Sequence, residues 1–285
     1  PVSETASPVA ISVFLALVIF ISSLGFIAGR WKRGNLNQLD EWGLGGRRFG
    51  PLLVWFLLGG DLYTAYTFVA LPALMYGAGG AGFFAVPYSI IVFPIVFAIF
   101  PKVWRLCAER GYVTAADMVQ GLFRNKALAL MIALTGIIAT MPYLSLQLVG
   151  LEAIFAGLGL HANVTLFGHE MELPLLVAFT VMAGFTYNSG IRAPAMMAIA
   201  KDILIYTTLI AAVIIIPAKL GGYAAVFDAV PPEKLIIPPS PADSLGPQFA
   251  YATLALGGAL GLFLYPHALT GLLAASSRDA IRRNA

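Results

Sequence analysis

Long apolar stretches separated by short polar connections run along the whole chain. Seven of them approach or exceed the roughly 20 residues that a helix needs to cross the hydrocarbon core of a bilayer. They lie near residues 8–29, 50–77, 81–105, 128–158, 173–189, 194–218 and 248–275. The pattern predicts an all-α, multi-pass membrane protein with seven transmembrane helices.

The first apolar segment lacks the basic start of a signal peptide, and a positive cluster, Arg30 to Arg33, follows it. We therefore expect a retained helix. Lys and Arg gather in alternate connections further along the chain, which the positive-inside rule assigns to the cytoplasm. The sequence thus predicts an external N-terminus and a cytoplasmic residue 285.

Composition agrees with a chain surrounded by lipid, since 59% of the residues are hydrophobic, 11% are charged and the mean hydropathy is +0.86. The net charge of +3 reflects orientation, because the basic residues form no clustered face of the kind that binds nucleic acid. The single cysteine, Cys107, excludes an internal disulfide. The oligomeric state stays open.

Two connections carry local signals of their own. Residues 219–246 hold five prolines, which favour an extended, polyproline-like external linker. Within residues 106–127, Thr114 precedes Asp117 at capping-box spacing, and apolar residues then recur on one helical face. We expect a short amphipathic helix there, on the cytoplasmic side.

Asp61 stands inside the second apolar segment, directly after Gly59 and Gly60. An aspartate at the centre of a spanning helix costs roughly 2.5 to 3.5 kcal/mol, so such residues usually face an ion, a pathway or a partner. A helix break at the two glycines would aim the amide groups of its second half, beside Thr64 and Thr67, at a small anionic solute. Alternatively, the glycines only let two helices pack closely.

The last segment has a comparable weak point. Gly257, Gly258 and Gly261 lie near its middle, and Pro266 follows. Two broken helices in corresponding places indicate the binding site of a transporter.

Further polar residues lie within the predicted spans. Tyr143, Gln147 and Gly150 share one helical face, which lines either a solute cavity or an interhelical hydrogen-bond seam. Glu152 is close enough to the outer end of that helix to reach water.

In the sixth segment, we expect Lys201 to extend toward the cytoplasmic surface, while the shorter Asp202 either pairs with Arg192 or lines an ion exit. His267 follows Pro266, where a structural hydrogen bond is more common than proton coupling. Signals for an enzyme are absent: His169-Glu170 lacks the second histidine of a zinc-protease helix, and no phosphate-cradling glycine loop follows a strand.

Several short runs together resemble the sodium/solute symporter family, and most closely its bacterial monocarboxylate permeases. They are Asp40-Glu41-Trp42-Gly43-Leu44-Gly45-Gly46-Arg47-Arg48, Trp55-Phe56-Leu57-Leu58-Gly59-Gly60-Asp61, Ala139-Thr140-Met141-Pro142-Tyr143, Gly190-Ile191-Arg192-Ala193-Pro194, Lys201-Asp202 and Tyr265-Pro266-His267-Ala268-Leu269-Thr270-Gly271.

The resemblance implies a LeuT-like fold of two inverted five-helix repeats, of which residues 1–285 form a part. Residues 8–29 would then be an extra N-terminal helix, residues 50–218 the first repeat and residues 248–275 the first helix of the second repeat. The rest of the second repeat, with further ion ligands on its third helix, is missing from this sequence.

The resemblance also implies site residues. Sodium would be bound at Gly59, Leu62 and Asp61, and Asp202 would take part in coupling. Solute would contact Gly60, Thr64, Tyr143, Gln147, Phe263 and Pro266. The chain departs from the family in having Ala200 and Lys201 where a Trp-Thr pair often precedes the aspartate.

The expected function is sodium-coupled uptake of a short monocarboxylate such as lactate or pyruvate. Three alternatives stay open: symport of another small solute such as an amino acid, acetate or a vitamin, a non-transporting sensor of the same fold, and a membrane enzyme. The last would need a convergent nucleophile and base, which the sequence does not reveal.

Overall fold

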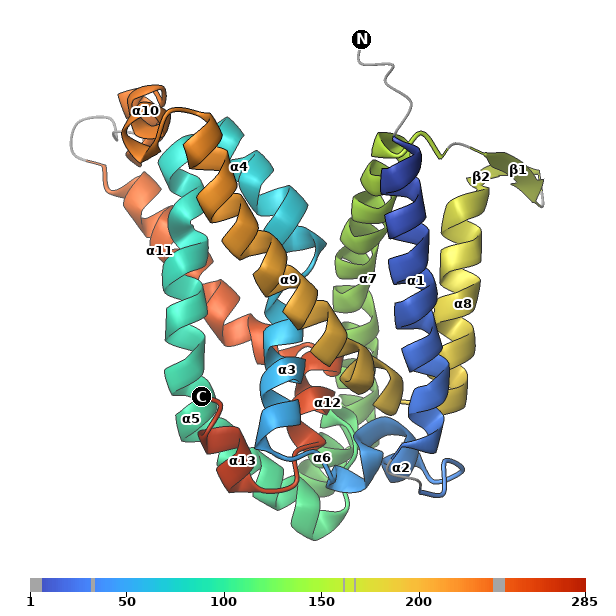
Figure 1. Ribbon diagram of the computed structural model, residues 1–285. Coiled ribbons are helices and arrows are strands. Elements are labelled where there is room, and N and C mark those ends of the chain that lie inside the picture. The colour runs from blue at the N-terminus through green and yellow to red at the C-terminus, as the bar shows by residue number, and fades with distance from the viewer. Residues whose placement is uncertain (1–6, 32–33, 161, 167, 238–243) are drawn as a thin grey trace.

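A computed structural model describes residues 7–31, 34–160, 162–166, 168–237 and 244–285. The long helices are α1 (Pro8–Ile27), α3 (Pro51–Leu62), α4 (Leu71–Ala78), α5 (Ala85–Arg110), α7 (Lys126–Gly157), α8 (Leu173–Ser189), α9 (Arg192–Lys219), α11 (Gly246–Gly261) and α12 (Pro266–Leu273). The connections hold α2 (Leu39–Leu44), α6 (Ala115–Phe123), α10 (Tyr223–Asp228), α13 (Arg278–Arg282) and an antiparallel hairpin of β1 (Asn163–Leu166) and β2 (His169–Glu172). The fold is thus helical apart from that hairpin, which the sequence analysis did not foresee (Figure 1).

Five helical stretches of the described chain are long and apolar enough to cross a membrane. They are Pro8–Arg30, Tyr66–Arg110, Lys126–Gly157, Arg192–Lys219 and Gly246–Leu264. Two of the predicted segments are represented by the shorter apolar helices Pro51–Leu62 and Leu173–Ser189. The chain is therefore a multi-pass membrane protein.

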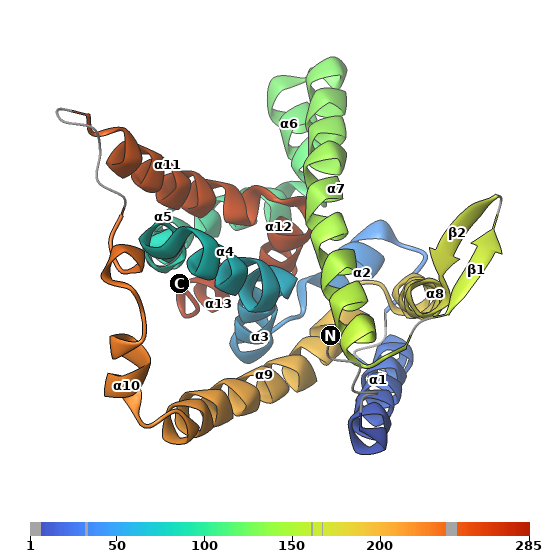
Figure 2. The same ribbon diagram turned by 90° about the horizontal axis from the view of Figure 1, so that it is seen from above.

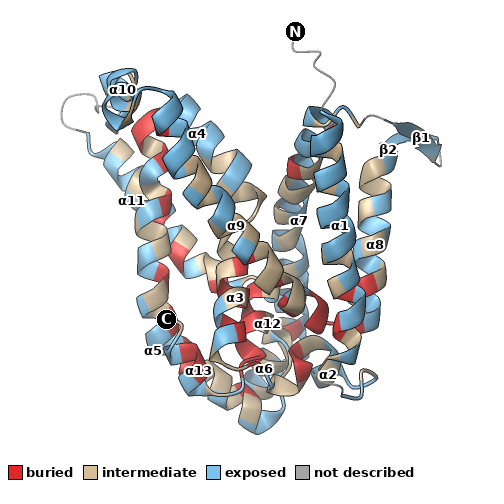
Figure 3. Ribbon diagram, viewed as in Figure 1, coloured by how far each residue is buried: buried red, intermediate tan, exposed pale blue. Residues whose placement is uncertain are grey.

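The helices form two groups that spread apart toward the end where α1 begins. Helices α1, α7 and α8 make one group, while α3, α4, α5 and α11 make the other, and α9 runs from the first toward the second (Figures 1 and 2). At the opposite end the groups meet beside α2, α6 and α13, and buried residues gather there (Figure 3). Much of the apolar surface along the spans stays exposed, for example Ile19, Ile138 and Ile214, and suits contact with lipid.

The first helix break lies at Tyr63 and Thr64, so its prediction at Gly59-Gly60 was wrong. Helix α3 continues through both glycines to Leu62, and Tyr63 then leaves the helical region with φ −92° and ψ 86°. The Thr67 hydroxyl donates to the Leu62 carbonyl at 2.5 Å, and the Thr64 hydroxyl accepts from the Tyr66 amide at 3.2 Å. Threonine hydroxyls compete with helical backbone bonds in this way, which explains the later break. A π-helical turn, Tyr66–Ala70, then leads into α4.

The second break also lies later than predicted. Gly257, Gly258 and Gly261 are helical residues of α11, and Gly258 brings that helix against Tyr88 of α5. The chain then makes a short 3₁₀ turn, Leu262–Leu264, and becomes extended at Tyr265 before α12 starts at Pro266. Proline is well suited to the first position of a helix, which fixes the restart there.

The two predicted connections turned out differently. Residues 106–127 contain the expected helix, α6, and Thr114 and Asp117 form the capping box. The extended linker at 219–246 was wrong in its described part, because α10 and a 3₁₀ turn, Pro232–Lys234, occupy it. The prolines at 238, 239 and 241 lie outside the described residues.

The connection after α10 also holds the tip of α4. Lys234 Nζ donates to the carbonyls of Tyr76 at 3.1 Å and Gly77 at 2.7 Å. Gly79 has φ +59°, and a Cβ there would lie 2.6 Å from the Lys234 carbonyl oxygen. A glycine is therefore required at this contact for its conformation as well as for space.

Candidate functional site

The two glycines before Asp61 form a contact surface for α9. A Cβ at Gly59 would lie 3.2 Å from Asp202 Oδ2, and one at Gly60 would lie 3.2 Å from Lys201 Nζ. Close packing, the alternative interpretation of this pair, therefore describes what the glycines do in the fold. Their absence of side chains lets two charged residues of α9 reach the backbone beside the break.

Lys201 points into the protein and not toward the cytoplasmic surface, so that expectation was wrong. Its Nζ donates to the Gly60 carbonyl at 2.7 Å and the Tyr63 carbonyl at 3.3 Å. The break removes helical amide partners from carbonyls at the end of α3, and these oxygens attract a cation. An internal partner thus replaces water for the ammonium group.

Asp202 is 1% exposed, and neither of its carboxylate oxygens has a hydrogen-bond partner within the described chain. The predicted pairing with Arg192 was wrong, because that guanidinium bonds to Glu41. Asp61 interacts electrostatically with Lys201 and Asp202. Its carboxylate also faces α12, where a Cβ at Gly271 would lie 3.9 Å from Oδ2.

The face of α7 predicted from residue spacing lies against the first break. The Ala65 amide donates to Gln147 Oε1 at 3.1 Å, and the Tyr143 side chain lies beside that of Thr64. Gly150 admits the close approach, because a Cβ there would be 2.7 Å from the Ala65 methyl carbon. Helix α7 is thereby fixed to the residues that follow the break.

The second break brings two more rings to the same place. The Tyr143 and His267 rings stack with centroids 4.8 Å apart and planes inclined by 17°, and Tyr265 lies 6.2 Å from Tyr143. Gln147 Nε2 and His267 Nδ1 are both buried without a hydrogen-bond partner in the described part of the chain. The sequence favoured a structural role for His267. Its position directly after Tyr265 and Pro266 was the signal that could have placed it at the second break.

Two predicted solute residues lie outside this cluster. Phe263 is 1% exposed and packs into the main core with its ring 6.0 Å from that of Phe100. Pro266 packs toward Gly136 of α7. A separate cavity of about 390 Å³ lies on another side of the α3 break, where its walls include Gly59 and Leu62 but none of the predicted solute residues.

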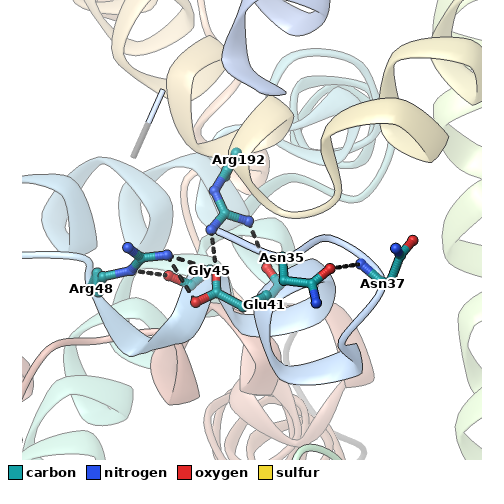
Figure 4. A network of polar contacts seen from close by, with 6 residues as sticks. All are labelled: Asn35, Asn37, Glu41, Gly45, Arg48 and Arg192. Carbon is teal, nitrogen blue, oxygen red and sulfur yellow. Dashed lines mark hydrogen bonds and ion pairs between the residues drawn. The ribbon is translucent and has the colours of Figure 1, made fainter. Parts of the chain in front are cut away.

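A partly buried ionic network joins the helices at the end opposite the start of α1. Arg192 has no exposed surface and donates to the carbonyl and the carboxylate of Glu41, and Arg48 Nη2 binds the same carboxylate at 2.7 Å (Figure 4). Arg47 donates to the carbonyls of Leu273 and Tyr112. The Glu41 network, made of Glu41, Arg48 and Arg192, was not predicted from the sequence.

The Glu41 network is expected to stabilise the fold. Burial raises the pKa of Glu41, but hydrogen bonds from Arg192 and Arg48 outweigh it and leave the pKa below its usual value. Glu41→Gln should cost roughly 2 kcal/mol of stability, because it leaves a buried guanidinium without its counter-charge. Thermal unfolding of the full-length protein in detergent would measure this.

Glu109→Gln is the matched control, since the Glu109 ion pair with Arg105 is exposed on both sides. Because the folded-state pKa of Glu41 is lowered, its contribution is present above the usual carboxyl pKa and is lost as pH falls through the folded value. Equal melting temperatures for Glu41→Gln and Glu109→Gln at neutral pH would contradict the role of the network.

Broken helices among membrane spans are typical of transporters, because the freed backbone groups bind solutes or ions there. Both breaks of this chain meet beside α7, next to buried polar atoms that have no hydrogen-bond partner among the described residues. The class defined by this arrangement is a membrane transport protein. Residues 42–285 match the sodium:solute symporter family, and the chain belongs to that family, which confirms the resemblance seen in its motifs.

Three relatives show the range of similarity. The chain is 50% identical over 285 residues to the monocarboxylate transport permease protein of Rhizobium johnstonii, covering 97% of this chain and 55% of the relative. It is 36% identical over 283 residues to the uncharacterized symporter YodF of Bacillus subtilis, with 96% and 54% covered. The sodium/proline symporter of Escherichia coli is 23% identical over 278 residues, with 94% and 51% covered.

The chain thus spans about half the length of the curated relatives that it matches. No solved structure matched it.

Proposed function

We propose that this chain is part of a symporter that carries a short monocarboxylate such as lactate or pyruvate into the cell across the plasma membrane, coupled to sodium. The proposal depends above all on Gln147 Nε2 and His267 Nδ1, which lie beside the two helix breaks and are buried without a hydrogen-bond partner in the part of the chain that the structure describes. Buried polar groups normally have hydrogen-bond partners, so a polar ligand is the simplest reason for leaving two of them unpaired. The name of the Rhizobium relative supports a monocarboxylate as that ligand.

The chemistry of the cluster suits a small carboxylate. Gln147 is oriented by the Ala65 amide at its oxygen, so its Nε2 group remains available as a donor. The stacked rings of Tyr143 and His267 provide a flat surface for a short carbon chain. A solute of a few carbon atoms would therefore find one oriented donor and one largely apolar wall.

For the fold, we infer two inverted repeats. We infer that transport proceeds by alternating access, in which the binding site opens to one side of the membrane at a time. Residues 8–29 are the extra helix, residues 50–218 the first repeat and residues 248–275 the opening of the second. The contact of α12 with α3 supports this, because it packs a helix of the second broken segment against one of the first. We also infer that the N-terminus is external and residue 285 cytoplasmic, with the Glu41 network on the cytoplasmic side.

Sodium fits Asp202 better than it fits the carbonyls of Gly59 and Leu62. Those carbonyls already accept from the Tyr63 amide and the Thr67 hydroxyl, and the Lys201 ammonium lies against the neighbouring carbonyls of Gly60 and Tyr63. Asp202, in contrast, is a buried carboxylate whose oxygens have no hydrogen-bond partner among the described residues. The positive charge of Lys201 beside it is shared with Asp61, so a further cation would lower the cost of burying Asp202. Bound sodium would supply that charge, and the membrane potential adds about 2.3 kcal/mol per charge for each 100 mV.

Uptake of labelled lactate and pyruvate by the full-length protein in proteoliposomes tests this function. We expect accumulation under an inward sodium gradient and little uptake when choline replaces sodium. Unlabelled proline and acetate serve as competitors, since an amino acid or acetate is the rival solute. Failure of lactate and pyruvate to accumulate, or stronger competition by proline than by either acid, would reject the monocarboxylate assignment.

A further inference from the structure

The position of Lys201 bears on how many ions the protein needs. Its ammonium group lies at the end of α3, where the break leaves the Gly60 and Tyr63 carbonyls without helical amides. These two oxygens point to one place and both accept from the same nitrogen. A dehydrated cation at a helix break is normally held by this kind of carbonyl group.

Two carboxylates of opposite charge lie near the Lys201 ammonium group. Asp61 belongs to the last turn of α3, and Asp202 is the next residue of α9; both interact electrostatically with Lys201. The fold also makes room for the lysine, because any side chain at Gly60 would meet its Nζ. Lys201 therefore has backbone oxygens, counter-charges and space arranged for it inside the protein.

We propose that the Lys201 ammonium is a tethered cation that takes the place of a sodium ion at the α3 break. The ammonium group occupies the Gly60 and Tyr63 carbonyls permanently as a hydrogen-bond donor. The only exchangeable cation that we propose for the described chain is therefore the sodium ion at Asp202. A second sodium at the break would lie against the ammonium group, and the repulsion between like charges is large where water is excluded. The inference rests on the proposed symport function only for the identity of the exchangeable ion.

Equilibrium binding of radioactive sodium to the purified full-length protein tests the inference without reference to any solute. The native protein and Lys201→Met are compared at constant ionic strength, with choline replacing sodium. Methionine fills a similar volume but leaves the Gly60 and Tyr63 carbonyls without a cation. We expect Lys201→Met to bind one more sodium ion per protein than the native chain, with labelled lactate bound about tenfold more weakly at low sodium and restored at high sodium.

Two further variants sharpen the comparison. Lys201→Arg keeps the positive charge and should bind sodium with the native stoichiometry. Lys219→Met, at the exposed end of the same helix, removes a lysine far from the break and should also match the native protein. An equal sodium stoichiometry in the native protein and in a folded Lys201→Met overturns the inference, as does an additional sodium in Lys201→Arg.

The outcome is independent of the transported solute. If lactate and pyruvate fail to bind at any sodium concentration while the sodium stoichiometry changes as expected, the proposed substrate is wrong and the tethered cation stands. If lactate binds and the sodium stoichiometry is the same in Lys201→Met and the native protein, the tethered cation is wrong and the proposed substrate stands.

Discussion

Asp202→Asn is expected to abolish the sodium dependence of uptake and to lower its rate about 100-fold at low sodium, the loss that a few kcal/mol of charge-assisted binding implies. The carboxylate is 1% exposed, and its oxygens have no hydrogen-bond partner among the described residues. It shares the positive charge of Lys201 with Asp61, so we expect a bound cation to complete its environment. Asparagine keeps the shape and removes the charge. Uptake of labelled lactate against sodium concentration measures the effect.

Asp228→Asn is the matched control, because Asp228 ends α10 on the exposed surface. Asp202→Glu keeps the charge and should retain a sodium response at reduced affinity. A sodium response in Asp202→Asn equal to that of the native protein would remove Asp202 from the ion site. Size-exclusion chromatography of each variant separates loss of binding from loss of fold.

The second large effect is expected for Gln147→Glu, which should raise the concentration of lactate needed for half-maximal uptake about 100-fold. Glutamate can still accept from the Ala65 amide, as Gln147 Oε1 does at 3.1 Å. It replaces the unpartnered Nε2 donor with a negatively charged oxygen, so a carboxylate solute meets repulsion in place of a hydrogen bond. The lost hydrogen bond and the new repulsion together should weaken solute binding by about 3 kcal/mol, which corresponds to the 100-fold change.

Initial uptake rates over a range of lactate concentrations measure this change. Gln120→Glu provides the control, since Gln120 is exposed on α6. Sodium binding should be preserved in Gln147→Glu, because Asp202 and Lys201 belong to a different helix. An unchanged lactate requirement would place the solute elsewhere, with the cavity beside Tyr66 and Tyr88 as the next candidate.

Local patterns in the sequence predicted features whose causes are local. The amphipathic helix α6 followed from the capping box of Thr114 and Asp117, and the face of α7 that meets the break followed from the spacing of Tyr143 and Gln147. Hydropathy also located the apolar segments, because lipid exposure demands long runs of apolar residues. The family itself was recognisable from the runs around Asp61 and His267.

Features that depend on distant partners were not predictable in this way. Glycines permit a helix to break but do not require it, so the actual break at Tyr63 depended on competing hydroxyls of Thr64 and Thr67. Lys201 can donate to the Gly60 carbonyl only because α3 ends beside it and leaves that carbonyl without a helical amide. Arg192 is paired across the fold with Glu41, 151 residues away, and no local pattern identifies such a partner.

The connection between α10 and α11 has a mechanical consequence. Lys234 bonds to the last carbonyls of α4, and its backbone touches Gly79, so the tip of the first broken helix and the segment leading toward the second are joined. A tilt of α4 about the break would therefore displace Lys234 and the residues next to it. Because that connection continues along the chain to α11, we expect the movements of the two broken helices to be coupled through it.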